Sequence, residues 1–431
     1  MPGPFGMVAA GVNAWTTQRL PQLNREVLAG GRRPEALAKE MAEALADLPG
    51  PLEWNTVQAR QMLVHLGLCG ASVVRHYQEQ GLAPPEDLAL PLSMIPVGTG
   101  AGLFRDYFAE LAARRDIGHP QRDSYAALVR WNTPTAVVRR QGETVCRLEG
   151  VFGDGAIRTY TGEPGEAAFL VLLKKAECLE LAANTVLREL EDEDCDLLGH
   201  RTAQRLNTAS RFLAAVHRLN LDFPGLPAGQ GLRTGHFLDV FRQFATHWAP
   251  GDIPPSGAQD VEYLKRDLIL GIDFPGYFES VRRQFPALLT REREDLLALE
   301  AVPSLPSRIL RAARDAGSDP RSVPAVAACY FLLHTNSRVS ASHFILTTKY
   351  LFKPHRAREE AGLADGVLVS HQAGTTGIVE QVLRRLMEGR RNHPLTFLDH
   401  AGRTELLATA GLSGEPRVST AECDEMVRLT V

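Results

Sequence analysis

The amino-acid sequence predicts an all-α protein. Apolar residues recur at helical spacing in many segments of the chain, as Leu37, Met41 and Leu45 do in the first of them. Clusters of proline and glycine separate these segments and end the predicted helices. One short stretch, residues 137–151, alternates as a small β-hairpin would, with its turn at 139–142.

The predicted helices follow one another along the chain. Leu48-Pro49-Gly50-Pro51 stops the first long one, and residues 81–85 break the second. In order, we expect helices over residues 33–48, 54–80, 103–114, 166–191, 201–219, 261–272, 277–285 and 290–299. A further segment, 323–338, either packs near the helix of residues 339–351 or runs continuous with it. A chain of 431 residues can bury a large core and hold two domains, and we place a mostly helical N-terminal region at 1–150 and a helical domain at 151–431.

Composition excludes several classes of protein. The net charge of −4 and the lack of a basic stripe with aromatics argue against a nucleic-acid partner. No run of about 18 apolar residues and no signal-like start is present, so we expect a cytoplasmic protein that does not cross a membrane. The six cysteines are scattered without a C-x-x-C pair, which predicts reduced thiols rather than a zinc site or disulfide framework.

His343 stands in the middle of a predicted helix. Val339, Leu346, Thr347 and Tyr350 share its face by spacing, and that face is largely apolar. Small neighbours would let a flat molecule approach the helix, and a neutral imidazole there suits the axial ligand of a haem iron. The structural alternative is a core histidine bonded to a backbone carbonyl.

The segment from His343 through Thr348-Lys349-Tyr350, followed by Gly374-Thr375-Thr376-Gly377, resembles the haem-dependent indoleamine and tryptophan 2,3-dioxygenase superfamily. In that family the proximal histidine stands in a similar helix, and a Gly/Thr-rich loop of the substrate site follows it. The resemblance implies a helical haem domain, haem b (heme b) as cofactor, His343 as the iron ligand, and substrate contacts at Gly374, Thr375, Thr376 and Gly377. His334, nine residues before His343, matches no motif but is kept as an alternative ligand.

Residues 237–248 resemble the family's F-F-x-x-L-R-x-x-L-x-x-W helix. The resemblance implies that Arg242 holds the substrate carboxylate and that Phe237 and Phe241 line the pocket, with Leu238 in place of the family's second phenylalanine. A guanidinium suits this role because it can donate two hydrogen bonds in a fixed geometry. The alternative is an arginine in a surface ion pair.

Three further sites follow from the resemblance. Gly257, Ala258 and Gln259 match a loop that touches haem and substrate before a helix ending near Ile272. Phe169 and Leu172 match the helix over the distal side of the haem, where Leu172 offers no hydroxyl to bound dioxygen.

The family has an arginine three residues before its proximal histidine; Ser340 stands there, and Arg338 is our candidate for a haem propionate. Thr376 and Ile378 also depart from the family's loop.

The flanks at 128–135 and 155–162 are most similar to the pyrrolnitrin-pathway branch (monodechloroaminopyrrolnitrin synthase-like). The sequence therefore predicts a haem-dependent oxygenase of specialised metabolism that acts with dioxygen on tryptophan or a related indole or aromatic amino acid. Ring opening, hydroxylation and rearrangement all stay open as outcomes. A haem sensor or carrier without turnover, and a helical interaction protein without cofactor, are the alternatives, and a homo-oligomer is compatible with the sequence.

Overall fold

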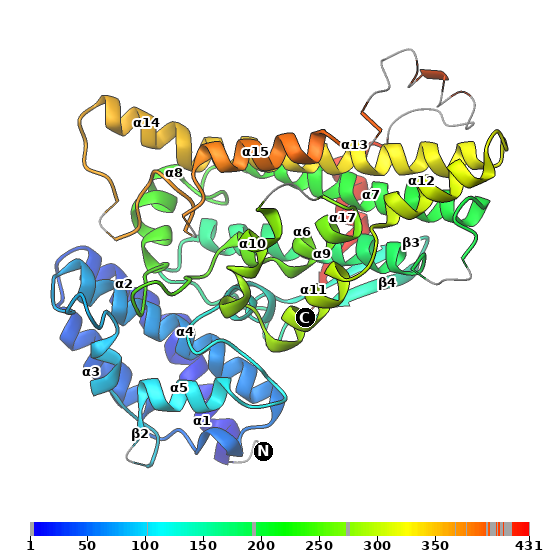
Figure 1. Cartoon of the computed structure of the whole chain (residues 1–431). Helices are drawn as coiled ribbons and strands as arrows, with labels where there is room; N and C mark the ends of the chain where they lie inside the picture. Colours follow the sequence, from blue (N-terminus) through cyan, green and yellow to red (C-terminus); the bar gives the residue numbers. More distant parts are fainter. Residues whose placement is uncertain are drawn as a thin grey trace.

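Helices make up most of the chain in the computed structural model, and strands form only two small sheets within its described part (Figure 1). The all-α class is confirmed at this level. The structure describes residues 4–100, 102–191, 195–272, 276–366, 368–375, 377–393, 395–396, 402, 404–405, 408 and 416–430.

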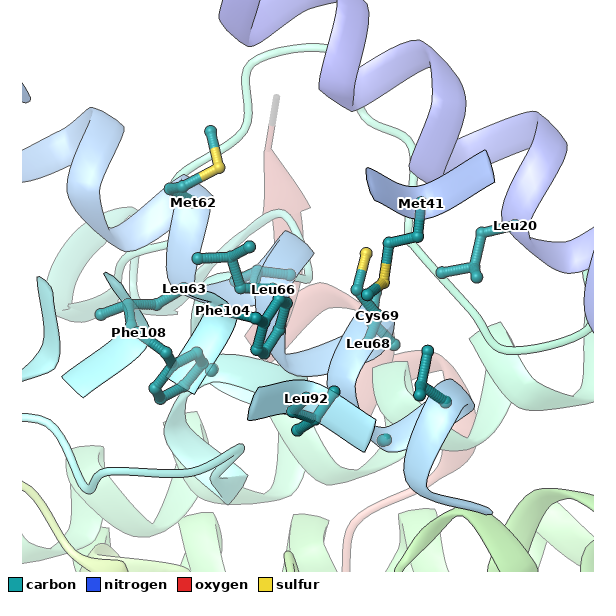
Figure 2. Packing of buried hydrophobic residues seen from close by; sticks show 14 of the residues in the cluster. Leu20, Met41, Met62, Leu63, Leu66, Leu68, Cys69, Leu92, Phe104 and Phe108 are labelled. Atoms are coloured by element: carbon teal, nitrogen blue, oxygen red, sulfur yellow. The ribbon is translucent and has the colours of Figure 1, made fainter. Parts of the chain in front are cut away.

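The N-terminal elements gather around one core, drawn in blue and cyan in Figure 1. They are α1 (Pro4–Ala14), α2 (Leu20–Leu28), α3 (Pro34–Leu45), α4 (Thr56–Glu79), β1 (Pro96–Val97), β2 (Gly102–Leu103) and α5 (Phe104–Ala112). Figure 2 shows how Leu20 of α2, Met41 of α3 and Phe104 of α5 close on the central helix α4. Burial of these apolar side chains stabilises helices that would be only marginally stable in isolation.

Helix α4 begins at a capping box. The side chain of Asn55 accepts a hydrogen bond from the Gln58 amide (2.9 Å), and the Gln58 side chain accepts one from the Asn55 amide (3.2 Å). Further along, Gly70 lies under the indole of Trp248, and a Cβ at this position would come within 2.6 Å of the ring. The N-terminal core is thereby packed against the segment that follows Arg242.

A hairpin of β3 (Thr135–Arg140) and β4 (Glu143–Leu148) forms as expected, and β5 (Val427–Thr430) joins it from the end of the chain. Gln141 and Gly142 make the two-residue turn with positive φ values of 51° and 86°. Near the other end, β3 pairs antiparallel with β5, with Val138 opposite Val427.

The remaining helices build a second core. They are α6 (Pro164–Arg188), α7 (His200–Asp222), α8 (Thr234–His236), α9 (Val261–Ile269), α10 (Tyr277–Arg282), α11 (Thr290–Glu300), α12 (Leu305–Ala316), α13 (Ser322–Thr347), α14 (Lys353–Glu360), α15 (Glu380–Arg391) and α17 (Thr420–Met426). Helix α7 packs between α6 and α13, and α15 lies along α13 (Figure 1). Among the helices described, none joins enough length to enough apolar character to span a bilayer. The domain boundary near residue 150 stays a prediction.

The expected helix over residues 237–248 is wrong in its second half. A π-helical turn (Phe237–Phe241) is followed by a 3₁₀ turn (Arg242–Phe244), after which the chain leaves the helix. The carboxylate of Asp252 accepts hydrogen bonds from the backbone amides of Trp248 (2.9 Å) and Ala249 (3.2 Å), so these amides are used outside a helix.

Candidate functional site

A cavity of about 310 Å³ lies between α6, α7, α9, α13 and the turns around Arg242, and it is partly open to solvent. Most residues that line it are apolar, which is typical of small-molecule sites. From α13 it receives Val339, His343, Leu346 and Thr347, and Tyr350 follows in a π-helical turn (Thr348–Phe352). The five side chains that spacing placed on one helical face therefore form one wall of the cavity.

The imidazole of His343 has no hydrogen bond, ion pair or ring contact within the described part of the chain. The His343 side chain is exposed on the side that faces the cavity, and protein surrounds its other sides. Desolvation, together with the positive charges of Arg390 and Arg266, lowers the pKa of His343 to about 4. The ring is therefore neutral at pH 7, with nitrogen lone pairs that a metal could use.

Phe169 and Leu172, both on α6, line the cavity from another side. Phe169 meets Phe237 and Phe241 with ring centroids 5.7 Å apart in each pair, and the planes are steeply inclined. Phe237 also meets Tyr350 of the His343 wall at 6.0 Å. These aromatic rings join the wall that carries His343 to the turn that carries Arg242.

Arg242 is buried, at 4% exposed, directly after the π-helical turn. The turn is held by Arg75 of α4, which donates to the backbone carbonyls of Val240 (2.6 Å) and Asp239 (3.3 Å). The Arg75 guanidinium also lies over the Phe244 ring at 4.2 Å. A buried arginine of the N-terminal part thus fixes the segment that places Arg242 on the cavity wall.

The guanidinium of Arg242 has no carboxylate partner within 4 Å among the described residues. Its Nη2 donates to the backbone carbonyls of Ser370 (2.8 Å) and Ala373, while its buried Nε has no hydrogen-bond partner. Burial lowers the pKa of Arg242 to about 10, against the opposing charge of Asp365, so it remains cationic at neutral pH. A buried cation without an ion pair is costly unless a ligand supplies the negative charge.

The loop before α9 divides into lining and supporting residues. Gly257 and Ala258 line the cavity, and a Cβ added at Gly257 would meet no atom within 4 Å. Gln259 does not face the cavity: its amide donates to the carbonyl of Pro254 (2.8 Å) and accepts from the Ser256 amide (3.3 Å). Gln259 therefore stabilises the loop, and its neighbours Gly257 and Ala258 line the cavity.

The predicted substrate loop is only partly at the cavity. Gly374 and Thr375 line it, whereas Gly377 does not and instead donates its amide to the Gly374 carbonyl (2.9 Å). Thr376 lies outside the described residues. Arg338 also lies away from the cavity lining, where its Nη1 donates to the carbonyl of Pro416 (3.4 Å).

Several polar groups at the cavity were not expected from the sequence, among them Tyr125, Glu180 and Asp260. Glu180 stands eleven residues after Phe169 on the same face of α6, so helical spacing alone could have found it. Nothing in the pattern marks Tyr125 or Asp260, which the fold brings in from separate segments.

No protein-family model matches this chain, and no curated protein matches it at a significant level. The described residues contain no group of three or more histidine, cysteine, aspartate or glutamate side chains arranged to hold a metal ion. The porphyrin supplies all the equatorial ligands of a haem iron, so a single histidine is all that such a site needs from the protein.

Proposed function

We propose that this protein is a haem-dependent oxygenase acting on tryptophan or a related aromatic amino acid. One observation carries the proposal: a neutral imidazole without a protein partner and a buried guanidinium without a carboxylate partner line the same apolar cavity. The first group suits a metal and the second suits an anion, so together they select a metal cofactor and a carboxylate ligand.

The residues present fit the ring and the iron of haem b. His343 would hold the iron, the apolar residues of α6 and α13 would contact the porphyrin, and the free space beside Gly257 would admit its edge. Haem bound there would supply an iron centre able to bind and activate dioxygen. Apart from Arg242, no described lining residue offers a cation to the two propionates, so these groups would lie where the cavity is open to water.

Arg242 would orient the substrate. Two nitrogen atoms of Arg242, Nε and Nη1, have no hydrogen bond to the described chain and remain to donate to a carboxylate. Nη2 stays fixed by two backbone carbonyls. Charge-assisted bonds from a guanidinium held in this way fix both position and angle. Phe169, Phe237 and Phe241 would pack on the aromatic ring of the substrate and keep water from it.

No hydroxyl or imidazole from Phe169 or Leu172 is available to donate to a diatomic molecule in the cavity. Leu172 instead packs with Leu346 and Tyr350 in an apolar cluster. A proton needed during the reaction would therefore come from the substrate itself or from another polar group at the cavity wall.

Turnover separates an oxygenase from a haem sensor or carrier. Haem-loaded protein, a reductant and dioxygen would be incubated with tryptophan and with halogenated or methylated tryptophans, and products read by mass spectrometry. An oxygenase adds one or two oxygen atoms to a substrate, or rearranges it with consumption of dioxygen. Haem binding with no product from any of these substrates would contradict the proposed activity and leave the carrier alternative.

A further inference from the structure

Two of the six cysteines lie against each other, one on a strand and one on a helix. Cys146 belongs to β4 and Cys178 to α6, and their Sγ atoms are 4.0 Å apart. Both are free thiols in the structure. The two positions are far apart in the chain, so no local pattern of the sequence marks them as a pair.

The packing of the β3–β4 hairpin on α6 brings the two thiols together. Val138 of β3 is the ladder partner of Cys146, and Ala136 and Val138 are buried in the same core as Cys178. The Cys178 thiol donates to the carbonyl of Ala136 (3.4 Å), and the Cys146 thiol donates to the carbonyl of Cys178 (3.4 Å). Both sulfur atoms therefore point into the contact between the hairpin and the helix.

A disulfide needs its sulfur atoms about 2 Å closer than these stand. Strand β4 can supply this shift, because it is the edge of the sheet of order β4-β3-β5 and pairs with β3 alone. The ladder register is also irregular between Val138 and Arg139, beside the position opposite Cys146. Cys178 stays in place meanwhile, since α6 packs against α7 and α9 as well as the hairpin.

The two thiols differ in their access to solvent. Cys146 is half-buried, whereas Cys178 is fully buried. The hydrogen bond with Cys146 and burial raise the pKa of the Cys178 thiol, so Cys178 remains protonated in the reduced protein. An oxidant from solvent therefore meets Cys146 first, with the Cys178 sulfur next to the product.

We propose that Cys146 and Cys178 form a peroxide-sensitive dithiol that closes to a disulfide within one chain. The peroxide transfers one oxygen atom to the Cys146 sulfur, which gives a sulfenic acid and one water. The Cys178 sulfur then attacks the Cys146 sulfur: the S–S bond forms, the S–O bond breaks, and the oxygen leaves with the Cys178 proton as a second water. Two electrons pass from the two thiols to the peroxide.

The bond would tie together the ends of residues 147–177. This segment carries Tyr160, Phe169 and Leu172 of the cavity wall, so the cross-link fixes the wall to the hairpin. A closed loop restricts the unfolded chain, and the oxidised protein should therefore melt at a higher temperature than the reduced protein. The inference concerns thiol chemistry alone and does not depend on the proposed haem.

The test counts thiols and maps the bond in the purified protein. Reduced protein, freed of reductant, would be treated with hydrogen peroxide, blocked with iodoacetamide in denaturant, and digested without reduction for mass spectrometry. We expect wild type to lose two of its six thiols, to yield a linked peptide pair containing Cys146 and Cys178, and to regain both thiols with dithiothreitol.

Cys195→Ser is the matched control. Cys195 is also half-buried, but its sulfur contacts the Thr202 hydroxyl (3.9 Å), so this variant should form the same linked pair as wild type. Cys178→Ser keeps the half-buried thiol and removes the sulfur that resolves its sulfenic acid. Dimedone, which reacts with sulfenic acids, should label Cys146 more strongly in this variant than in wild type.

Two results would overturn the proposal. The first is a wild type that keeps all six thiols after peroxide, or that links other cysteines or two separate chains instead. The second is equal dimedone labelling of Cys146 in wild type and in Cys178→Ser, which would show that the buried thiol does not resolve the sulfenic acid. Either result would leave the proposed oxygenase function untouched, because none of these measurements reads haem binding or turnover.

Discussion

Arg242 and Gln243, adjacent in the chain, hold the same loop by different kinds of bond. Nη2 of Arg242 donates to the carbonyls of Ser370 (2.8 Å) and Ala373. The amide of Gln243 accepts from the backbone N–H of Val369 and donates to its C=O, each at 3.0 Å, as a neighbouring strand would. This loop continues into the cavity wall, so we expect a ligand bound at Arg242 and the order of the loop to stabilise each other.

Gln243→Leu keeps the volume of the side chain but removes its bonds to the loop. We expect the amides of residues 368–375 to exchange hydrogen faster, and aromatic amino acids to bind about 3- to 10-fold more weakly. Hydrogen-exchange mass spectrometry and calorimetry would measure the two effects. Gln372→Leu, on the exposed side of the same loop, is the control, and unchanged exchange in Gln243→Leu would show that the loop does not depend on this amide.

Arg242→Lys keeps the charge but loses the planar fork. We expect tryptophan to bind about 10- to 100-fold more weakly, since a point charge cannot reproduce the charge-assisted geometry. Tryptamine has the same ring and amine without the carboxylate, so its affinity should change little. An equal loss for both ligands would mean that Arg242 supports the fold of the cavity rather than the carboxylate.

Glu180→Gln should change how stability depends on pH. Desolvation raises the pKa of Glu180 to about 7 in the folded protein; Arg266 opposes this, and the neighbouring carboxylates Asp267, Glu177 and Glu262 add to it. The folded state then binds more protons than the unfolded state between the ordinary pKa of glutamate and pH 7, so wild type loses stability as pH rises through this window.

The variant lacks this titration. As pH rises from about 5 to about 8, the unfolding free energy of Glu180→Gln should therefore increase by up to a few kcal/mol relative to that of wild type. Urea unfolding at a series of pH values would measure the difference. If the unfolding free energy of wild type instead rises relative to that of the variant as pH rises, then Arg266 holds the Glu180 carboxylate ionised. The pKa of Glu180 would then be lowered rather than raised.

Replacing Arg130 tests how much a buried ion pair contributes to stability. Arg130 pairs with Glu177 (2.5 Å) and with Glu292, and all three side chains are nearly buried. Arg130→Met leaves two buried carboxylates without a cation, which should cost about 3–5 kcal/mol of unfolding free energy. Arg205→Met breaks the exposed pair with Glu189 and should cost about 1 kcal/mol or less. Similar losses in both variants would contradict the role of burial.

Residues that lie on one helical face were predictable, because spacing alone decides which side chains point the same way. His343 with Val339 and Leu346, and the hairpin with its turn at Gln141 and Gly142, follow from period and turn chemistry. The placement of Arg242 and Phe169 at the same cavity followed from motif resemblance, since no local pattern brings segments so far apart together.

Other features depend on tertiary contacts that the sequence does not display. The helix expected through Trp248 ends early because the Asp252 side chain takes up backbone amides. Arg338 carries the right charge for a propionate, but it lies away from the cavity lining. In the sequence, Glu180 and Asp260 are ordinary charged residues. In the structure the ion pair with Arg266 holds Glu180 at the cavity wall, and Asp260 is held there as the N-cap of α9.

Ligation of iron by His343 is the claim on which the proposed function depends most. Titration of the purified protein with haemin, followed by the Soret band, would test it in wild type, His343→Ala and His334→Ala, the last being a histidine of the same helix that does not line the cavity. We expect tight binding at one haemin per chain in wild type and His334→Ala, and a lost or shifted Soret band in His343→Ala. No specific haem binding in wild type, or an unchanged band in His343→Ala, would contradict it.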